Sequence, residues 1–125
     1  MLRERSQLTR EIDFLHSKLI RLIESDRCFV CGSRDAPTCG HLFGRGRRNT
    51  RWDIEPAGNC HVQCANCNAY HSDVGMGPYI EVFIKANGAD AFDALRLRAN
   101  TSHHYFNHEL RELRDRFAYE LKARQ

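Results

Sequence analysis

Two short stretches of the sequence decide the fold: Cys28-Phe-Val-Cys31-Gly32 and Cys64-Ala-Asn-Cys67. Each holds two cysteines separated by two residues, a spacing typical of zinc knuckles, and Gly32 suits the turn that aims backbone N–H groups at the thiolates. The segment between the pairs is rich in Gly, Arg and Asn, so metal binding, worth on the order of 10 kcal/mol in small zinc modules, would supply folding energy that its few apolar groups lack. The sequence therefore predicts a structural zinc ion bound by Cys28, Cys31, Cys64 and Cys67.

The composition sets the context in which these cysteines are interpreted. The chain has 125 residues, of which 42% are hydrophobic and 28% are charged, as expected for one soluble globular domain. No stretch is long and apolar enough to cross a bilayer, and the charged stretch from Met1 to Arg10 lacks the core of a signal peptide, which argues against export. In a reducing compartment the six cysteines are better interpreted as metal ligands than as disulfides. A net charge of +3 is too small to indicate a nucleic-acid partner by itself.

Both ends of the chain carry the pattern of amphipathic helices. Near the N-terminus the apolar residues recur at alternating spacings of four and three, at Leu8, Ile12, Leu15, Leu19 and Leu22. This stripe either packs on a C-terminal helix of the same chain or forms a dimer seam with a second copy. Near the other end Asn107 is placed to cap a helix that has Glu109 in its first turn and one apolar stripe, at Leu110, Leu113, Phe117 and Leu121.

Two shorter helices are predicted before the final one. Gly77-Pro78 is typical of a helix start, and Asn87-Gly88 is typical of a helix end. A further short helix follows through Phe92, Leu95 and Leu97. We interpret both helices as core elements that carry no chemistry.

The residues between and around the cysteine pairs occur in an order that resembles a known family. The motifs are, in chain order, Cys28-x-x-Cys31, Gly40-His41, an Arg-Gly loop, Arg51-Trp52-Asp53, Asn59-Cys60-His61-Val62-Gln63-Cys64 and Cys67-Asn68. This order resembles the HNH, or ββα-metal, nucleases and, more narrowly, the NinG (Rap) recombination endonucleases of lambdoid phages. The similarity extends to the final helix and so covers about residues 28–123. The ending Cys67-Asn68 is also similar to that of the endonuclease VII junction resolvases.

The resemblance implies a fold and a function. The implied fold is α+β and mostly helical: an amphipathic helix at residues 1–27, a zinc-bound treble-clef ββα-metal core at residues 28–80, and helices of the same domain at residues 81–125. The implied function is a metal-dependent DNA endonuclease that uses Mg or Mn, cleaves Holliday junctions or D-loops, and leaves a 5′ phosphate. Its implied location is the cytoplasm of a bacterial host cell, with the gene carried by a phage or prophage. A homodimer would supply the two sites that symmetric resolution needs.

Three polar residues are the candidates for the catalytic site. His41 is predicted to be the general base, because imidazole can deprotonate water near neutral pH and the Gly-His position matches the family pattern. The amide oxygen of Asn68 suits a divalent ion beside the scissile phosphate, although Asn68 is also placed to cap the helix that begins near Cys64. By the family pattern Asn59 bridges the backbone across the hairpin and keeps the His41 loop in shape; the alternative is an ordinary turn residue.

One position departs from the commoner HNH pattern. Gly40 stands where many HNH nucleases have an Asp that binds the catalytic ion, so one ligand is missing. His71 lies three residues after Asn68 on the same predicted helical face and is a candidate replacement.

A basic loop is predicted to bind DNA. No acidic residue interrupts its four arginines, Arg45, Arg47, Arg48 and Arg51. Guanidinium groups bind phosphate bidentately, so the loop is expected to contact the DNA backbone without reading bases. The alternative is a solvated, charged hairpin.

The remaining residues of this region are given no role in binding or catalysis. Trp52 is predicted to be packed rather than to stack on a base, and Cys39 and Cys60, which lie outside the paired spacing, are interpreted as small buried residues. Two rival functions stay open. The missing Asp favours a zinc-stabilised DNA-binding module without catalysis, and the stripe from Leu8 to Leu22 allows an interaction protein whose zinc knuckles are purely structural.

Overall fold

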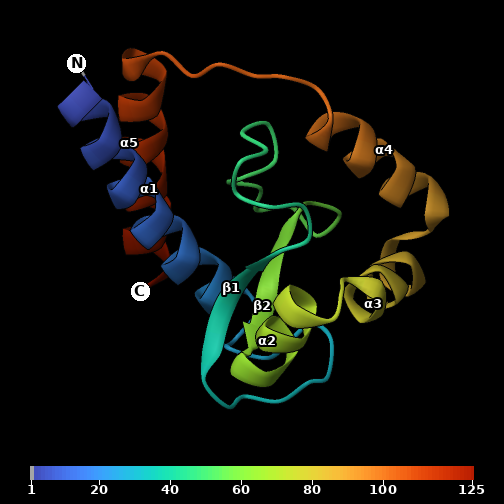
Figure 1. Cartoon of the computed structure of the whole chain (residues 1–125). Helices are drawn as coiled ribbons and strands as arrows, with labels where there is room; N and C mark the ends of the chain where they lie inside the picture. The colour runs from blue at the N-terminus through green and yellow to red at the C-terminus, as the bar shows by residue number, and fades with distance from the viewer. Residues whose placement is uncertain (1) are drawn as a thin grey trace.

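The computed structural model describes residues 2–125. In this part of the chain five helices surround a two-stranded hairpin, in the order α1 (Leu2–Ile23), β1 (Pro37–His41), β2 (Cys60–Cys64), α2 (Ala65–Asp73), α3 (Gly77–Asn87), α4 (Ala89–Ala99) and α5 (Asn107–Arg124). The fold is therefore small, α+β and mostly helical. The hairpin lies between the α1 and α5 pair on one side and α3 and α4 on the other (Figure 1). None of the described helices combines the length and hydropathy needed to span a membrane.

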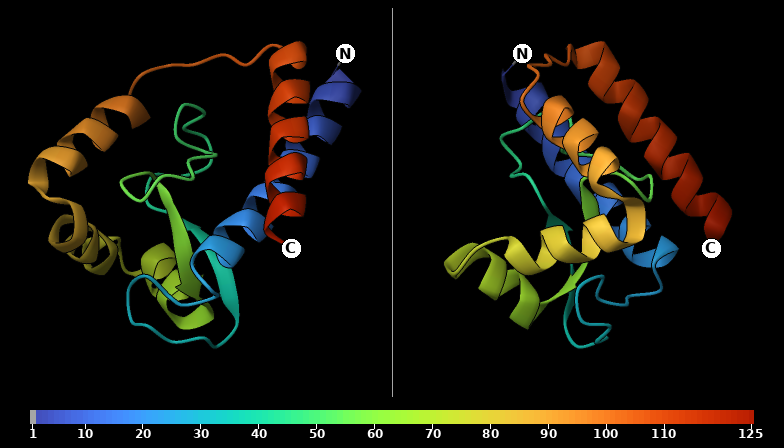
Figure 2. Two further views of the ribbon diagram at one scale, coloured as in Figure 1. Left: turned by 180° about the vertical axis from the view of Figure 1, so that it is seen from behind. Right: turned by 90° about the vertical axis from the view of Figure 1, so that its right-hand side faces the viewer.

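Helices α1 and α5 pack side by side and run in the same direction (Figure 2). Their apolar stripes form one core cluster with the loop residue Trp52; the helical members are Leu8, Ile12, Leu19, Leu110 and Phe117. Ion pairs between Glu4 and Arg111 and between Glu11 and Arg114 lie along the same contact. Packing within the chain is thus confirmed for the N-terminal stripe. The same burial removes the stripe as a dimer seam, and with it the surface on which the interaction-protein hypothesis rests.

The N-terminus of α5 differs by one residue from the prediction. Asn107 is the first helical residue, and the extended Phe106 occupies the capping position. The carboxylate of Glu109 accepts a hydrogen bond from the Phe106 N–H at 2.9 Å. Asn107 is therefore not the cap, because Glu109 satisfies the backbone from within the first turn.

Helices α3 and α4 cover the other side of the hairpin. The start of α3 at Gly77 and its end at Asn87 are confirmed, and Gly88 follows with a φ of 95° that suits glycine. The core cluster on this side contains Leu42, Tyr79, Phe83 and Leu95. Leu97 was predicted to join the core but is 70% exposed, because the buried face of α4 is formed by Leu95 and Ala99.

The hairpin places alternate side chains on two different sides. Cys39 and His41 share one face of β1, and the antiparallel register puts His41 opposite Cys60 on the same face, which packs against α1. Gly40 points to the opposite face, where a Cβ atom would lie 2.1 Å from the Gln63 Oε1 atom. A side chain at position 40 would therefore collide with the buried Gln63 side chain, which fills that space.

Candidate functional site

The two cysteine pairs meet beside the hairpin. The Phe29 N–H donates to the Val62 carbonyl at 2.7 Å, which ties the first pair to β2, and Gly32 makes the predicted turn with a φ of 81°. The sulfur atoms of Cys28, Cys31, Cys64 and Cys67 all lie within 4.8 Å of one another. Cys31 Sγ and Cys64 Sγ are 3.7 Å apart, close to the separation of about 3.8 Å that Zn–S bonds of about 2.3 Å impose in a tetrahedron. The four cysteines are thus placed as ligands of one zinc ion.

The electrostatics of this cluster also fit a cation. Burial raises the pKa of Cys28, but backbone N–H groups, those of Cys31 and Cys64 first, outweigh it and lower the pKa to about 7. Burial and the neighbouring thiols raise the pKa of Cys67. Sulfurs this close repel one another as thiolates unless a cation lies between them, and a zinc ion is such a cation.

Helix α2 begins at this cluster. Cys64 Sγ accepts a hydrogen bond from the Cys67 N–H at 3.5 Å and so caps the helix. Capping was the alternative role for Asn68, and the structure gives that role to Cys64. The Asn68 side chain is exposed and is placed one helical turn further on.

A cavity of about 430 Å³ brings most of the predicted catalytic residues together. Its walls come from α1, β1, the loop that follows β1, and α2. The lining residues are Asp13, His16, Ser17, Cys39, His41, Gly44, Arg45, Asn68, His71 and Ser72. The base candidate, the ion-ligand candidates and one loop arginine thus share one cavity.

His41 is held in one tautomer within this cavity. Its Nε2 atom lies 2.9 Å from the Arg51 carbonyl oxygen, which can only accept a hydrogen bond. Nε2 therefore carries the proton, and the lone pair is on Nδ1. Burial lowers the pKa of His41, and the nearby Cys39 opposes this only in part. The ring is thus neutral near neutral pH, as a general base must be.

Asn59 supports the backbone directly after His41. Its side chain donates to the Phe43 carbonyl at 2.8 Å and accepts from the Phe43 N–H at 2.7 Å, while its own carbonyl accepts from Leu42 at 2.9 Å. Asn59 is fully buried, and its N–H donates to the Asp53 carboxylate at 2.8 Å. Asn59 is therefore a positioning residue that joins the two ends of the long hairpin loop.

The two ion-ligand candidates differ in how well they fit. Asn68 offers an amide oxygen, a hard donor of the kind that Mg and Mn prefer. His71 is partly buried, which lowers its pKa, and its buried Nδ1 atom has no hydrogen-bond partner among residues 2–125. Ligating histidines usually donate their second ring nitrogen to a fixed acceptor, so His71 fits the role of ligand less well than Asn68 does.

The four loop arginines do not act alike. Arg45 is 57% exposed at the cavity, 3.0 Å from Asp13, whereas Arg47 bonds to the carbonyl of Ala99 and to Asn100. Arg48 is partly buried, and its Nη1 atom has no partner within residues 2–125. These three remain candidates for phosphate contact.

Arg51 is less accessible for the predicted DNA contact than Arg45 and Arg47. Its side chain is only 13% exposed, and its guanidinium makes two hydrogen bonds to the Asp13 carboxylate, at 3.2 and 2.7 Å. The guanidinium also donates to the Arg45 carbonyl at 3.2 Å, so three of its five N–H donors are used within the chain. Arg51 thus ties the loop to α1, and Trp52 beside it is packed in the core, as predicted.

The contributions of α1 to the cavity are absent from the sequence-based prediction. Asp13 accepts from the Trp52 indole at 2.8 Å as well as from Arg51, and these bonds lower its pKa although burial opposes them. His16 is 1% exposed and lies four residues after Ile12, at a core position of the amphipathic helix. A histidine at a buried helical position was the available signal.

The fold and the site first define a class: a small α+β protein in which a four-cysteine cluster adjoins a cavity lined by His and Asn. A family model described as Bacteriophage Lambda NinG protein matches residues 1–125. The chain belongs to this family, which places it among recombination-related phage proteins. Neither a curated protein nor a solved structure matches the chain.

Proposed function

We propose that this protein is a metal-dependent DNA endonuclease that cleaves branched recombination intermediates, such as Holliday junctions and D-loops, inside the bacterial host cell. The observation that carries the proposal is the cavity that His41 shares with Asn68 and Arg45. A base, an oxygen ligand for a divalent ion and a phosphate-binding cation are the groups that phosphodiester hydrolysis needs. The strand, strand, helix order of β1, β2 and α2 next to the zinc cluster supports a treble-clef ββα-metal core of the HNH type.

In the proposed mechanism each side chain has a separate task. His41 takes a proton from water through Nδ1, while the Arg51 carbonyl holds the Nε2–H and fixes the ring. The exposed guanidinium of Arg45 binds the DNA backbone at the cavity, and Asn59 keeps the loop in shape. Asn68, with His71 as the second candidate ligand, would hold a Mg or Mn ion, which supplies positive charge for the phosphoryl and leaving oxygens.

Cleavage of a synthetic four-way junction tests this proposal. Wild-type protein that holds one zinc ion per chain, in the four-cysteine cluster, should nick or resolve the junction when Mg or Mn is added, and should bind without cutting when both are omitted. The products should carry 5′ phosphates. A folded protein with one zinc ion per chain that binds the junction but never cuts it in either metal would instead support the non-catalytic DNA-binding module.

Resolution of a junction also bears on the oligomer. Two symmetric cuts need two active sites, so we propose that two copies act on one junction. The α1 stripe is buried against α5 and does not join them. The mass of the protein–junction complex in solution tests this stoichiometry.

The basic loop predicts a specific salt dependence. Replacing Arg45 and Arg47 together by Ala should remove about two phosphate contacts, and so flatten the slope of log affinity against log salt by about two units. The double variant Arg34→Ala/Arg124→Ala removes the same charge outside the loop and should leave the slope unchanged. Equal slopes for the wild type and the loop variant would exclude the loop from the DNA-binding surface.

A further inference from the structure

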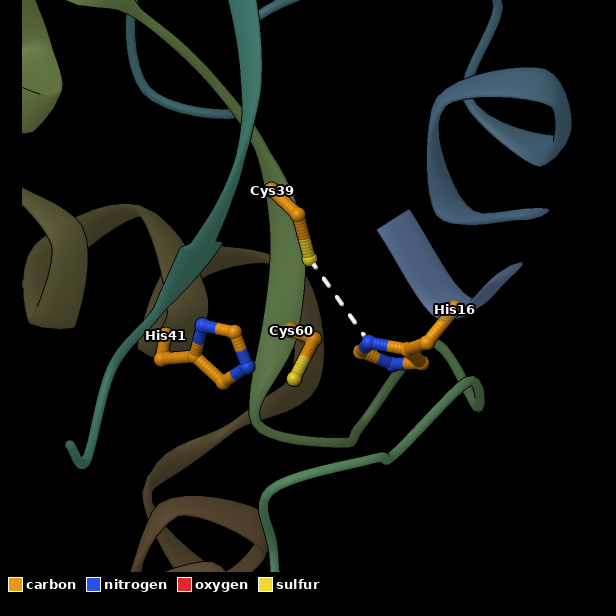
Figure 3. Close-up of side chains that lie close together, drawn as sticks. All are labelled: His16, Cys39, His41 and Cys60. Carbon is orange, nitrogen blue, oxygen red and sulfur yellow. Dashed lines mark hydrogen bonds between the residues drawn. The ribbon is translucent and has the colours of Figure 1, made fainter. Parts of the chain in front are cut away.

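A second group of metal-ligating side chains lies on the side of the hairpin that faces α1. His16 comes from α1, Cys39 and His41 from β1, and Cys60 from β2 (Figure 3). One ligand atom from each of these four residues lies within 4.8 Å of the other three. The β1–β2 register brings three of the four residues together, because it aligns Cys39, His41 and Cys60 on one face of the hairpin.

His16 is oriented as metal-bound histidines usually are. Its Nε2 atom lies 2.8 Å from the Asp53 carbonyl oxygen, so Nε2 carries the proton. Its Nδ1 lone pair points at Cys39 Sγ, 3.9 Å away (Figure 3). A backbone carbonyl that holds one ring nitrogen while the other faces a thiol is the arrangement that fixes the tautomer of a ligand. A histidine that is merely packed in a core needs no such partner for its second nitrogen.

His41 presents its Nε2 edge to the same group. Its Nε2 atom and Cys60 Sγ reach one and the same acceptor, the Arg51 carbonyl oxygen, at 2.9 and 3.4 Å. The two potential ligand atoms are therefore neighbours, as Figure 3 also shows. Cys60 is almost fully buried, whereas His16, Cys39 and His41 line the cavity, which gives an ion a way in.

The donor set determines the kind of ion. Two thiols and two imidazoles are soft or borderline ligands, which select zinc and similar ions over Mg and Ca. Neither cysteine belongs to a C-x-x-C pair, and the four ligands come from three separate elements. Ligand spacing along the sequence therefore gives no sign of such a site.

We propose that His16, Cys39, His41 and Cys60 form a second metal site, distinct from the four-cysteine cluster, that binds a thiophilic divalent ion such as Zn²⁺. Binding releases the two thiol protons to solvent. His41 binds through Nε2, so its ring proton moves to Nδ1. This second step rests on the proposed nuclease function and deepens it: with Nδ1 protonated, His41 has no lone pair for water, and the occupied site inhibits cleavage.

Metal stoichiometry tests the site without any reference to activity. Wild-type protein should bind two zinc ions per chain by elemental analysis after dialysis against buffered zinc. Cys39→Ser, Cys60→Ser and His16→Asn should each bind one. His104→Asn, which changes an exposed histidine in the loop before α5, should still bind two. A wild-type value of one, or a value of two in all three site variants, would overturn the proposal.

A titration with Co²⁺ keeps the test valid even if a variant fails to fold, because it uses the wild type. The first equivalent should fill the four-cysteine cluster, and the second should add thiolate-to-cobalt absorption of about half the intensity, since two thiolates bind it instead of four. Absence of any thiolate-to-cobalt absorption from the second equivalent would contradict the site.

The inhibitory step has its own readout. Added zinc should slow junction cleavage by the wild type, and at least tenfold more zinc should be needed for the same fractional loss in Cys39→Ser. Each protein is compared with its own rate when only the four-cysteine cluster holds zinc. Two bound ions without inhibition would refute the inhibitory step and leave the site intact. A protein that binds two ions at saturating zinc but never cuts, even when only the four-cysteine cluster is filled, would refute the nuclease function and leave the site intact.

Discussion

Replacing His41 with Ala should lower the rate of junction cleavage by about 10²–10⁴-fold, the contribution expected of a general base. The reason is that no other side chain has been assigned to take the proton from the attacking water. Binding of the junction should be nearly unchanged, because His41 is uncharged and partly buried. Single-turnover cleavage and equilibrium binding, measured on the same preparations, check both parts.

A matched replacement separates the role in catalysis from a general effect of losing a histidine. His104→Ala removes an exposed imidazole outside the cavity and should cleave at the wild-type rate. The His41→Ala protein should keep the zinc ion of the four-cysteine cluster and its cooperative unfolding, which would show that the hairpin is intact. A folded His41→Ala protein that cuts within about tenfold of the wild-type rate would remove His41 from the role of base.

Removing zinc from the four-cysteine cluster is expected to have the largest effect on stability. Structural zinc contributes on the order of 10 kcal/mol in small modules, which is comparable with the entire stability of a typical domain. The segment from Cys28 through α2 depends on this cluster, because the thiols tie the first turn to β2 and to the start of α2. We expect β1, β2 and α2 to lose protection from hydrogen exchange in the apo protein, while α1 and α5 keep part of theirs through their shared core.

Two cysteine variants distinguish this effect from a general loss of thiols. Cys67→Ser removes one ligand of the cluster and should reproduce the exchange pattern of the apo protein. Cys39→Ser removes a thiol outside the cluster and should leave α2 protected. Equal protection of the hairpin with and without metal would show that the four cysteines are ordinary core residues.

Much of the architecture follows from local sequence patterns. Helix α3 begins at Gly77, next to Pro78, and ends before Gly88, because these residues are strong local signals for a helix start and a helix end. The final helix could be placed for the same reason, although its cap could not, since Asn107 and Glu109 both offer a side chain and only the packed structure selects Glu109. Leu97 shows what apolar spacing cannot predict in a short helix. Leu95 and Leu97 lie on different faces of α4, and only the packing of the neighbouring elements determines that Leu95 is the buried one.

The candidate site was predictable where its residues lie close together in the sequence or match a family motif. His41, Asn59 and Asn68 belong to such motifs, and their placement around one loop and one cavity depends on the hairpin that those motifs frame. The pairing of Arg51 with Asp13 was not predictable, because Asp13 lies on helix α1, 38 residues earlier in the sequence. An arginine that forms an ion pair with a carboxylate of the same chain is less free to bind DNA phosphate. Contacts between segments that are distant in the sequence determine whether such a pair forms.

The sequence by itself determined the two cysteine pairs, the helix boundaries set by glycine, and the amphipathic stripes, because each depends on residues within a few positions of one another. Only the tertiary structure decided that α1 packs on α5 rather than on a second copy, and that His16 joins Cys39, His41 and Cys60. The physical reason is that metal ligands are selected by distance in space. The antiparallel register and the packing of α1 bring these four residues together, and neither can be inferred from the spacing of the residues along the chain.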